Sequence, residues 1–394
     1  MKLITSFILI TITILISACN KDPEVVPLNL INIEEDGLLL SINDTVKLQV
    51  QTDCDDTCSI TWKSSDESIV KVDKEGNLYS LSLGDAFVVA SISNSEPDTC
   101  YITVLTYKQF TNKDGLFDDY VRFITVDKNN VWFSSFTKGV IKYDGTNWQS
   151  YTVSDGLKSN NITFIYPEPN SNNIWFASAN DGVSFYDGTQ WRYFSESDGL
   201  LSNQVHVIKK DNTGNMWFGT EKGISKYDGT NWVSFTTENN MYGYSHNSLI
   251  FDIEIDANNC YYFLNHNAIT TLKDGKWNGF EPKGTTYSLT IDYENNIWAC
   301  DLGGFYKLND LIWEEQFPEK EHNHFVNMVV DSKNDLWIKS YYNLFKYSKG
   351  ILYESYGKIN NEVIHSDGNE IAIDNNDNIW LSKSNDGVFF IKTK

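Results

Sequence analysis

The sequence predicts an all-β protein, in which a small β-sandwich precedes a seven-bladed β-propeller closed by an N-terminal outer strand. Three observations support this fold class. Tryptophan-bearing segments recur at intervals of about 40 residues over most of the chain. Short stretches of alternating apolar and polar residues are separated by Asn, Asp and Gly, as in strands joined by tight turns. With 41% hydrophobic and 14% aromatic residues among 394, the chain can also bury a large core.

The composition and the missing motifs exclude several function classes. The formal net charge is −22, whereas nucleic-acid binding needs clustered positive charge, so we expect no nucleic-acid partner. The chain contains no HExxH, GxSxG or CxxC motif, which are typical of metal sites and activated nucleophiles. We therefore expect no metal and no cofactor.

The N-terminus has the pattern of a secretory leader. Lys2 is followed by a largely apolar run over residues 3–16, which has signal-peptide length and is short for a membrane span. The tetrapeptide ISAC, ending at Cys19, resembles the lipobox of bacterial lipoproteins. That resemblance implies a signal peptide over residues 1–18, a lipid on Cys19 and a polar tether over residues 19–27, so the membrane is a partner through the N-terminal lipid. The alternative is an ordinary secretory signal with an incidental cysteine.

Residues 28–105 read as a set of short alternating strands, which indicates a sandwich. The run WKSSDESIVKVD, which begins at Trp62, closely resembles the group 2 bacterial Ig-like domain, common in surface proteins and adhesins. The resemblance implies an Ig-like sandwich over this whole segment, with Trp62 in its core. We expect the module to act as a spacer.

Three cysteines lie in this segment. The resemblance places Cys54 and Cys58 in one inter-strand loop and Cys100 at the start of the last strand, at the same end of the sandwich. A disulfide from Cys100 to either of the other two, or a local Cys54–Cys58 bridge, is sterically reasonable in an oxidising compartment. The sequence leaves the connectivity open.

From Tyr107 onward one unit of four strands, a to d, recurs. Four strands in about 40 residues are typical of a propeller blade. Residues 107–111 match a strand d, and the last copy ends after its strand c. We therefore expect the displaced strand to complete the last blade and close the ring. Strand b carries an aromatic marker at Trp132, Trp175, Trp217, Tyr261, Trp298, Trp337 and Trp380.

The third copy carries the most specific motif. The stretch from Asp198 to Asp228 resembles the two-component regulator propeller repeat, DGLxSNxV…DxxGNxWxGTxxGxxxYD. The motif is clear in the first three copies and eroded in the fourth to the sixth. In that family such propellers form extracellular sensor domains of hybrid sensor kinases. The resemblance implies a propeller over residues 106–394 that serves as a sensor-like, ligand-binding platform.

A recurring aspartate after strand a raises the question of calcium. Because the Asp/Asn/Gly turn recurs at the same place in nearly every copy, we interpret it as a turn former and not as a calcium site. Cys260 and Cys300, on neighbouring copies, are interpreted as buried thiols. The aspartates are Asp127, Asp211, Asp256, Asp292, Asp331 and Asp374.

The candidate ligand-binding residues break the repeat near the expected channel mouth. Connections between blades gather there, and function concentrates on loops held by a rigid frame. Aromatic loop residues suit stacking on sugar rings or apolar peptide groups, and the rare Arg122 could hold a carboxylate. The candidates are Arg122, His206, Tyr242, Tyr244, His246, His266, Tyr341 and Tyr342.

These expectations combine into one hypothesis. The chain is a lipid-anchored lipoprotein of the cell envelope, at the outer membrane or cell surface in preference to the inner membrane. Its propeller binds a glycan or an extracytoplasmic protein. One alternative is a propeller lyase or hydrolase with a histidine base, because the Trp-bearing blades distantly resemble streptogramin lyases. The other is a purely structural or adhesion component.

Overall fold

The computed structural model describes residues 30–393 except 54–57, 129, 239–240, 242–247, 266–267, 282–283, 310–311, 318–323, 342, 356–369 and 384–385. These residues form β-strands and short 3-10 helices. Within them no helix is long and apolar enough to cross a membrane.

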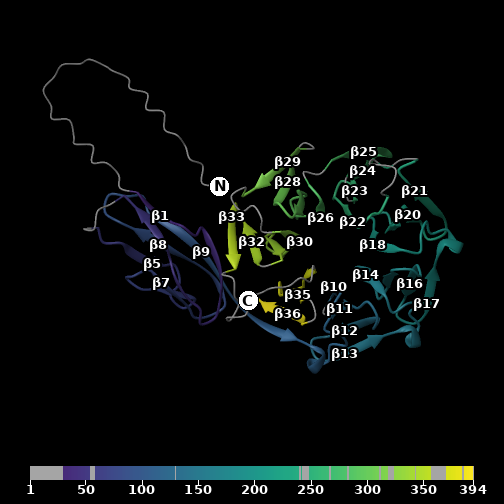
Figure 1. The fold of residues 1–394 in the computed structure, drawn as a ribbon, viewed down its shortest axis with the longest axis horizontal. Coiled ribbons are helices and arrows are strands. Elements are labelled where there is room, and N and C mark those ends of the chain that lie inside the picture. Colours follow the sequence, from purple (N-terminus) through teal and green to yellow (C-terminus); the bar gives the residue numbers. More distant parts are fainter. Residues whose placement is uncertain are drawn as a thin grey trace, which may run out of the picture.

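Sheets of four antiparallel strands are arranged around a ring, which is the architecture of a propeller (Figure 1). Their first strands contact one another in sequence, and β34 (Ile371–Ile373) returns to contact β10. Five of the sheets are separate from the rest. They consist of β10 (Phe123–Asp127), β11 (Asn130–Ser134), β12 (Val140–Tyr143) and β13 (Trp148–Tyr151); β14 (Ile162–Pro167), β15 (Ile174–Ser178), β16 (Val183–Tyr186) and β17 (Trp191–Phe194); β18 (Val205–Lys210), β19 (Met216–Thr220), β20 (Gly223–Tyr227) and β21 (Trp232–Phe235); β22 (Asp252–Ile255), β23 (Tyr261–Leu264), β24 (Ile269–Lys273) and β25 (Lys276–Phe280); and β26 (Thr286–Ile291), β27 (Ile297–Asp301), β28 (Phe305–Asn309) and β29 (Ile312–Gln316).

The remaining propeller strands belong to an 11-stranded sheet. Its two four-stranded groups are β30 (Phe325–Val330), β31 (Leu336–Ser340), β32 (Leu344–Ser348) and β33 (Ile351–Ser355), and β34, β35 (Ile379–Lys383) and β36 (Gly387–Lys392) with the end of β9 (Asp98–Phe110).

The expected pairing of the displaced strand is present. Residues 106–110 of β9 pair antiparallel with β36. The last strand of the propeller is thus paired with a strand that comes before all the other propeller strands in the sequence. Phe110 stacks on Trp380 at 5.7 Å and 20°. Phe194 stacks on Trp175 in the same way, at 5.5 Å and 24°. Residues 106–110 therefore occupy the place that the fourth strand takes in the other sheets.

Five of the six recurring aspartates form the predicted turn by accepting backbone N–H groups two and four residues later, and Asp127 is the exception among the described residues. In Asp211, one carboxylate oxygen accepts the backbone N–H groups of Thr213 and Asn215, each at 2.9 Å. The other oxygen accepts the Asn215 amide and the Trp217 indole N–H, each at 2.8 Å. Since both oxygens are occupied by protein donors, this turn does not need a cation. No group of three or more potential metal ligands occurs among the described residues.

The aspartate turn also holds the buried tryptophan of strand b by a hydrogen bond. In four sheets the indole donor lies six residues after its aspartate, as in Asp331 to Trp337 at 3.0 Å. Trp175 donates instead to Glu168 at 2.7 Å, and no partner for the Trp132 indole occurs among the described residues.

The turn further shows which residue takes the tryptophan position in the β22–β25 sheet. Six residues after Asp256 comes Tyr262, which pairs with Glu254 in the register that the tryptophans use. The marker of the β22–β25 sheet is therefore Tyr262 and not the predicted Tyr261.

The Asp-Gly-Leu segments form capped 3-10 turns on the face where one sheet connects to the next. These turns are η1 (Asn112–Asp114), η2 (Val153–Asp155) and η3 (Glu196–Asp198), and each has a capping box and a left-handed glycine after it. The glycine lies against the leading tryptophan of the following outer strand, so the turn is pinned to the frame.

The N-terminal strands pack around a separate core. They are β1 (Ile31–Ile33), β2 (Gly37–Ser41), β3 (Thr45–Lys47), β4 (Val50–Thr52), β5 (Thr61–Ser64), β6 (Val70–Val72), β7 (Asn77–Ser80), β8 (Gly84–Ser91) and the first half of β9. Trp62 packs against this core, as predicted. Cys58 is disulfide-bonded, whereas Cys100, Cys260 and Cys300 are buried thiols. A bridge through Cys100 is therefore not formed, and Cys54 lies outside the described residues.

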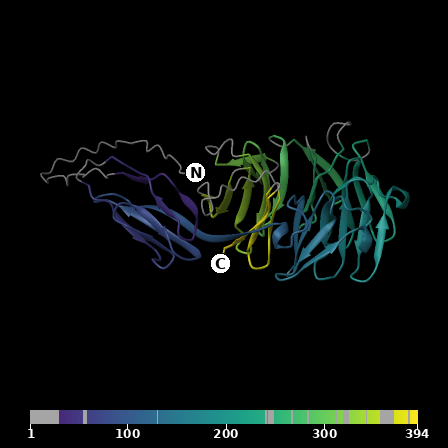
Figure 2. The same ribbon diagram turned by 60° about the horizontal axis from the view of Figure 1, so that its bottom comes forward.

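The N-terminal unit is docked directly on the propeller, beside β33 and β36 (Figures 1 and 2). β2 inserts between β33 and β9 and pairs with both in parallel. Leu38 and Leu40 of β2 face the N-terminal core, while Leu39 joins the propeller cluster around Trp337. This alternation follows from the two-residue period of a strand. Because β9 runs unbroken from the N-terminal unit into the propeller, no linker separates the two parts.

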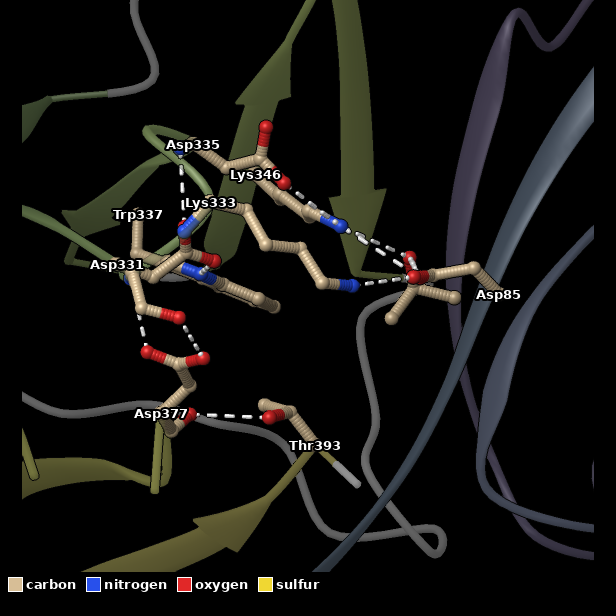
Figure 3. Close-up of polar contacts among 10 residues, drawn as sticks. Asp85, Asp331, Lys333, Asp335, Trp337, Lys346, Asp377 and Thr393 are labelled. Carbon is tan, nitrogen blue, oxygen red and sulfur yellow. Dashed lines mark hydrogen bonds and ion pairs between the residues drawn. The ribbon is translucent and has the colours of Figure 1, made fainter. Parts of the chain in front are cut away.

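A charged cluster joins the same two parts (Figure 3). Asp85 of β8 pairs with Lys333 at 2.9 Å and with Lys346 at 3.5 Å, both from the propeller. Lys346 is almost fully buried and also pairs with Asp335 at 3.2 Å. The N-terminal unit therefore shares strands, core and ion pairs with the propeller.

Candidate functional site

The candidate site lies on the inner rim of the propeller, around Arg122. This residue immediately precedes β10, and its Nη1 donates to Oδ1 of Asn161 at 2.6 Å. Its guanidinium lies 4.4 Å above the ring of Phe136. Burial lowers the pKa of Arg122, but guanidinium stays charged at every accessible pH. Within the described part of the chain, no carboxylate lies within ion-pair distance of it.

Two exposed aromatic rings adjoin this guanidinium. Tyr120 and Phe136 are 40% and 42% exposed and form an edge-to-face pair at 5.2 Å. They come from two different connections, and Asp118 ties these together: it accepts from Ser135 Oγ at 2.6 Å and from the backbone N–H of Tyr120 at 3.1 Å. The pair is therefore held in place before any ligand arrives. Neither ring was among the residues predicted from the sequence.

His206 occupies the position on β18 that aligns with Arg122 in the Asp-Gly-Leu repeat. Its Nε2 is buried, and no hydrogen-bond partner for it occurs among the described residues. Burial lowers the pKa of His206, and the charge of Arg122 lowers it further, so the ring is neutral at pH 7. A neutral imidazole offers one donor and one acceptor to a ligand.

Equivalent positions on or beside the first strand of each sheet form a ring below this rim. One side is apolar, with the rings of Phe123 and Phe164 in contact at 4.2 Å. The opposite side is polar, with Ser288 and Asn327 hydrogen-bonded at 3.1 Å. The positions are Phe123, Phe164, Val207, Asp252, Ser288, Asn327 and Glu370.

Two of these positions carry carboxyl groups with strongly shifted titration. Burial raises the pKa of Glu370 to about 8; Lys339 and Arg122 oppose this rise, and the charge of Asp252 adds to it. Burial, aided by the charge of Glu254, raises the pKa of Asp252 to about 7. Glu370 is therefore mostly protonated at neutral pH, and it does not neutralise Arg122.

Other predicted site residues are scattered or undescribed. Tyr341 lies between β31 and β32, half-buried, with its ring edge-on to His324 at 6.0 Å. Of the described candidates, Arg122 and His206 lie at equivalent positions and close enough for the charge of Arg122 to lower the pKa of His206, while Tyr341 comes from the β30–β33 sheet. Tyr242, Tyr244, His246, His266, Tyr342 and the lipidation residue Cys19 lie outside the described residues.

The second arginine of the chain has different surroundings. Arg192 lies 4.6 Å above Phe185 and lines a cavity of about 200 Å³ between two neighbouring sheets. Glu168, which pairs with Lys210 at 2.5 Å, lines the same cavity. Arg192 therefore shares a cavity with a carboxylate, whereas Arg122 lies at the rim beside exposed rings.

The comparisons with known proteins agree with this architecture. Residues 199–222 match the family described as two component regulator propeller. The chain is similar to the extracellular domain of a hybrid two component system from B. thetaiotaomicron, at 19% identity and a TM-score of 0.61, covering 74% of this chain and 42% of that one. It thus spans less than half of that relative.

Two further solved structures are similar to this chain in fold. Virginiamycin B lyase from Staphylococcus aureus is 13% identical with a TM-score of 0.57, covering 73% of this chain and 98% of that one. PorZ, a surface component of the type-IX secretion system of Porphyromonas gingivalis, is 12% identical with a TM-score of 0.56, covering 90% and 57%. No curated protein matches in sequence. At these identities the similarities establish the propeller fold.

Proposed function

We propose that this chain is a membrane-anchored, extracytoplasmic lipoprotein whose seven-bladed propeller binds a glycan or protein ligand at its inner rim. The N-terminal unit, an Ig-like module, is a spacer that separates the propeller from the tether to the lipid anchor. The observation that carries the proposal is the rim around Arg122, where an arginine lacking an ion pair among the described residues contacts an exposed aromatic pair and lies close enough to His206 to lower its pKa.

Three findings support an extracytoplasmic binding role. Exposed aromatics near the centre of a rigid surface are typical of recognition sites. The similar domain from B. thetaiotaomicron is extracellular, and PorZ is a surface component. The ISAC leader predicts export and a lipid on Cys19.

Two measurements test the proposal. Cys19→Ser should abolish incorporation of labelled fatty acid and shift the chain out of the membrane fraction. The full chain, purified in detergent, should bind at least one member of combined glycan and protein arrays, and His206→Ala should weaken that binding. A chain that stays in the membrane without Cys19, or arrays that remain silent, would refute the anchoring or the binding part respectively.

A further inference from the structure

The rim residues form a compact unit, which we call the rim platform and define as Tyr120, Arg122, Phe136 and Asn161. Three contacts link its four members: Phe136 touches both Tyr120 and the Arg122 guanidinium, and Arg122 donates to Asn161. Asp118 holds the connections that carry Tyr120 and Phe136. Binding to such a preformed platform costs little ordering entropy.

The chemistry of the platform is mixed. The aromatic rings offer exposed faces, on which the C–H side of a sugar ring can stack. Only one of the five N–H donors of Arg122 is used among the described residues, and the ring of Phe136 leaves the planar fork aligned for a bidentate partner. Oδ1 of Asn161 accepts from Arg122, so its amide N–H₂ is left to donate to a hydroxyl.

Arg122 is the cationic group of the platform in an acidic molecule, and the nearby Asp118 carboxylate is hydrogen-bonded to Ser135 and Tyr120. The net charge of the chain is −22, which repels polyanions at long range. Near the platform, however, His206 is neutral and Glu370 is mostly protonated at pH 7, so the Arg122 charge persists. One uncompensated guanidinium fits one carboxylate.

We propose that the rim platform binds an oligosaccharide through a single acidic sugar residue, a uronic or sialic acid. Its ring stacks on Tyr120 and Phe136, its carboxylate takes the free fork of Arg122, and a hydroxyl accepts from Asn161. This inference rests on the proposed function and narrows its ligand from glycan or protein to a carboxylate-bearing glycan. An acidic peptide would also pair with Arg122, but it would leave the amide and the stacking faces without matching hydroxyls and ring.

The test uses the full chain in detergent and a panel of oligosaccharides that each carry one uronic or sialic acid. Each is paired with its carboxyl-reduced counterpart, and acidic peptides are added as a third class. By titration calorimetry, at least one acidic oligosaccharide should bind about tenfold or more tightly than its reduced form, because a bidentate charged pair is lost on reduction. Arg122→Gln should remove this difference, and Arg122→Lys should restore part of it.

The aromatic variants separate stacking from charge. Tyr120→Ala should weaken the acidic and the reduced form by the same factor. Phe136→Ala should weaken the acidic form more than the reduced form, because the Phe136 ring also supports the Arg122 guanidinium. Arg192→Gln and Tyr193→Ala are matched controls, since Arg192 also lies over a ring and Tyr193 is similarly exposed, and neither should alter binding. Unchanged thermal unfolding of each variant shows that folding is intact.

The outcomes distinguish this inference from the proposed function. If only peptides or proteins bind, or if a glycan binds Arg122→Gln as tightly as the native chain, the acidic-sugar assignment is wrong while the binding function stands. If no carboxylate-bearing glycan exceeds its reduced form, the assignment is also overturned. If nothing binds from any class, both fail.

Discussion

The glycines of the Asp-Gly-Leu turns are constrained twice, by backbone conformation and by space. Gly156 has φ of +114°, and a Cβ there would lie 2.4 Å from the ring of Trp191. Gly156→Ala should therefore lower the free energy of unfolding by about 2 to 4 kcal/mol, from left-handed strain plus overpacking. Gly145→Ala is the control, because its φ of +93° is similar but nothing lies within 4 Å, and it should cost about 1 kcal/mol. Equal losses in denaturant unfolding would exclude the steric contribution.

The carboxyl group of Glu370 makes stability depend on pH. Its pKa rises from 4.5 in the unfolded chain to about 8 in the folded protein, chiefly through burial. Between these values the folded protein holds a proton that the unfolded chain has lost. The stabilisation is therefore complete below about pH 4.5 and is lost as the pH rises towards 8.

Replacing this group should flatten the pH profile. For Glu370→Gln, the free energy of unfolding should fall less between about pH 5 and pH 8 than it does for the native chain, by up to about 1.4 kcal/mol per pH unit. Asp252, with a pKa of about 7, leaves a residual slope of the same sign. Urea unfolding at three pH values measures both slopes, and identical slopes would show that Glu370 is ionised at neutral pH.

At the scale of elements, β9 is the strand on which the ring depends. Phe110 is buried against Trp380 of its own sheet and Trp148 of the β10–β13 sheet, so it joins the two ends of the ring. Phe110→Ala should cost about 3 to 5 kcal/mol, as expected for a buried aromatic. Phe194→Ala, at the equivalent place in an uninterrupted sheet, is the reference. A much smaller loss at Phe110 would mean that the end of β9 adds little to closure.

The sequence predicts those elements that repeat, and the structure explains why. Each sheet uses the same core position on its second strand, so Trp132 and its equivalents mark the frame without knowledge of the fold. The error at Tyr261 arises because that copy has two adjacent tyrosines, which only the Asp256 turn tells apart. Tyr120 and Phe136 could not be paired from the sequence, since they meet through two connections that a one-dimensional repeat does not juxtapose.

At the scale of the whole molecule, the junction is a long-range feature that local patterns do not encode. Leu38 and Leu39 pair with Glu354 and Ser355, from opposite ends of the chain. All five residues of β2 are buried, because its two faces serve two different cores. The sequence of β2 alone is that of an ordinary buried strand, so it does not reveal that its second face packs on the propeller.

The shared strands predict that the N-terminal unit and the propeller unfold together. A Cβ on Gly37 would lie 2.9 Å from Tyr353 Cγ and 3.1 Å from the Leu352 carbonyl oxygen, so Gly37→Val should push β2 away from β33. Calorimetry should then show two transitions in place of one, with the first at lower temperature. Thr45→Val, at an exposed position of β3 away from this contact, should keep a single transition. If Gly37→Val also keeps a single transition at an unchanged temperature, the β2–β33 contact does not couple the two parts.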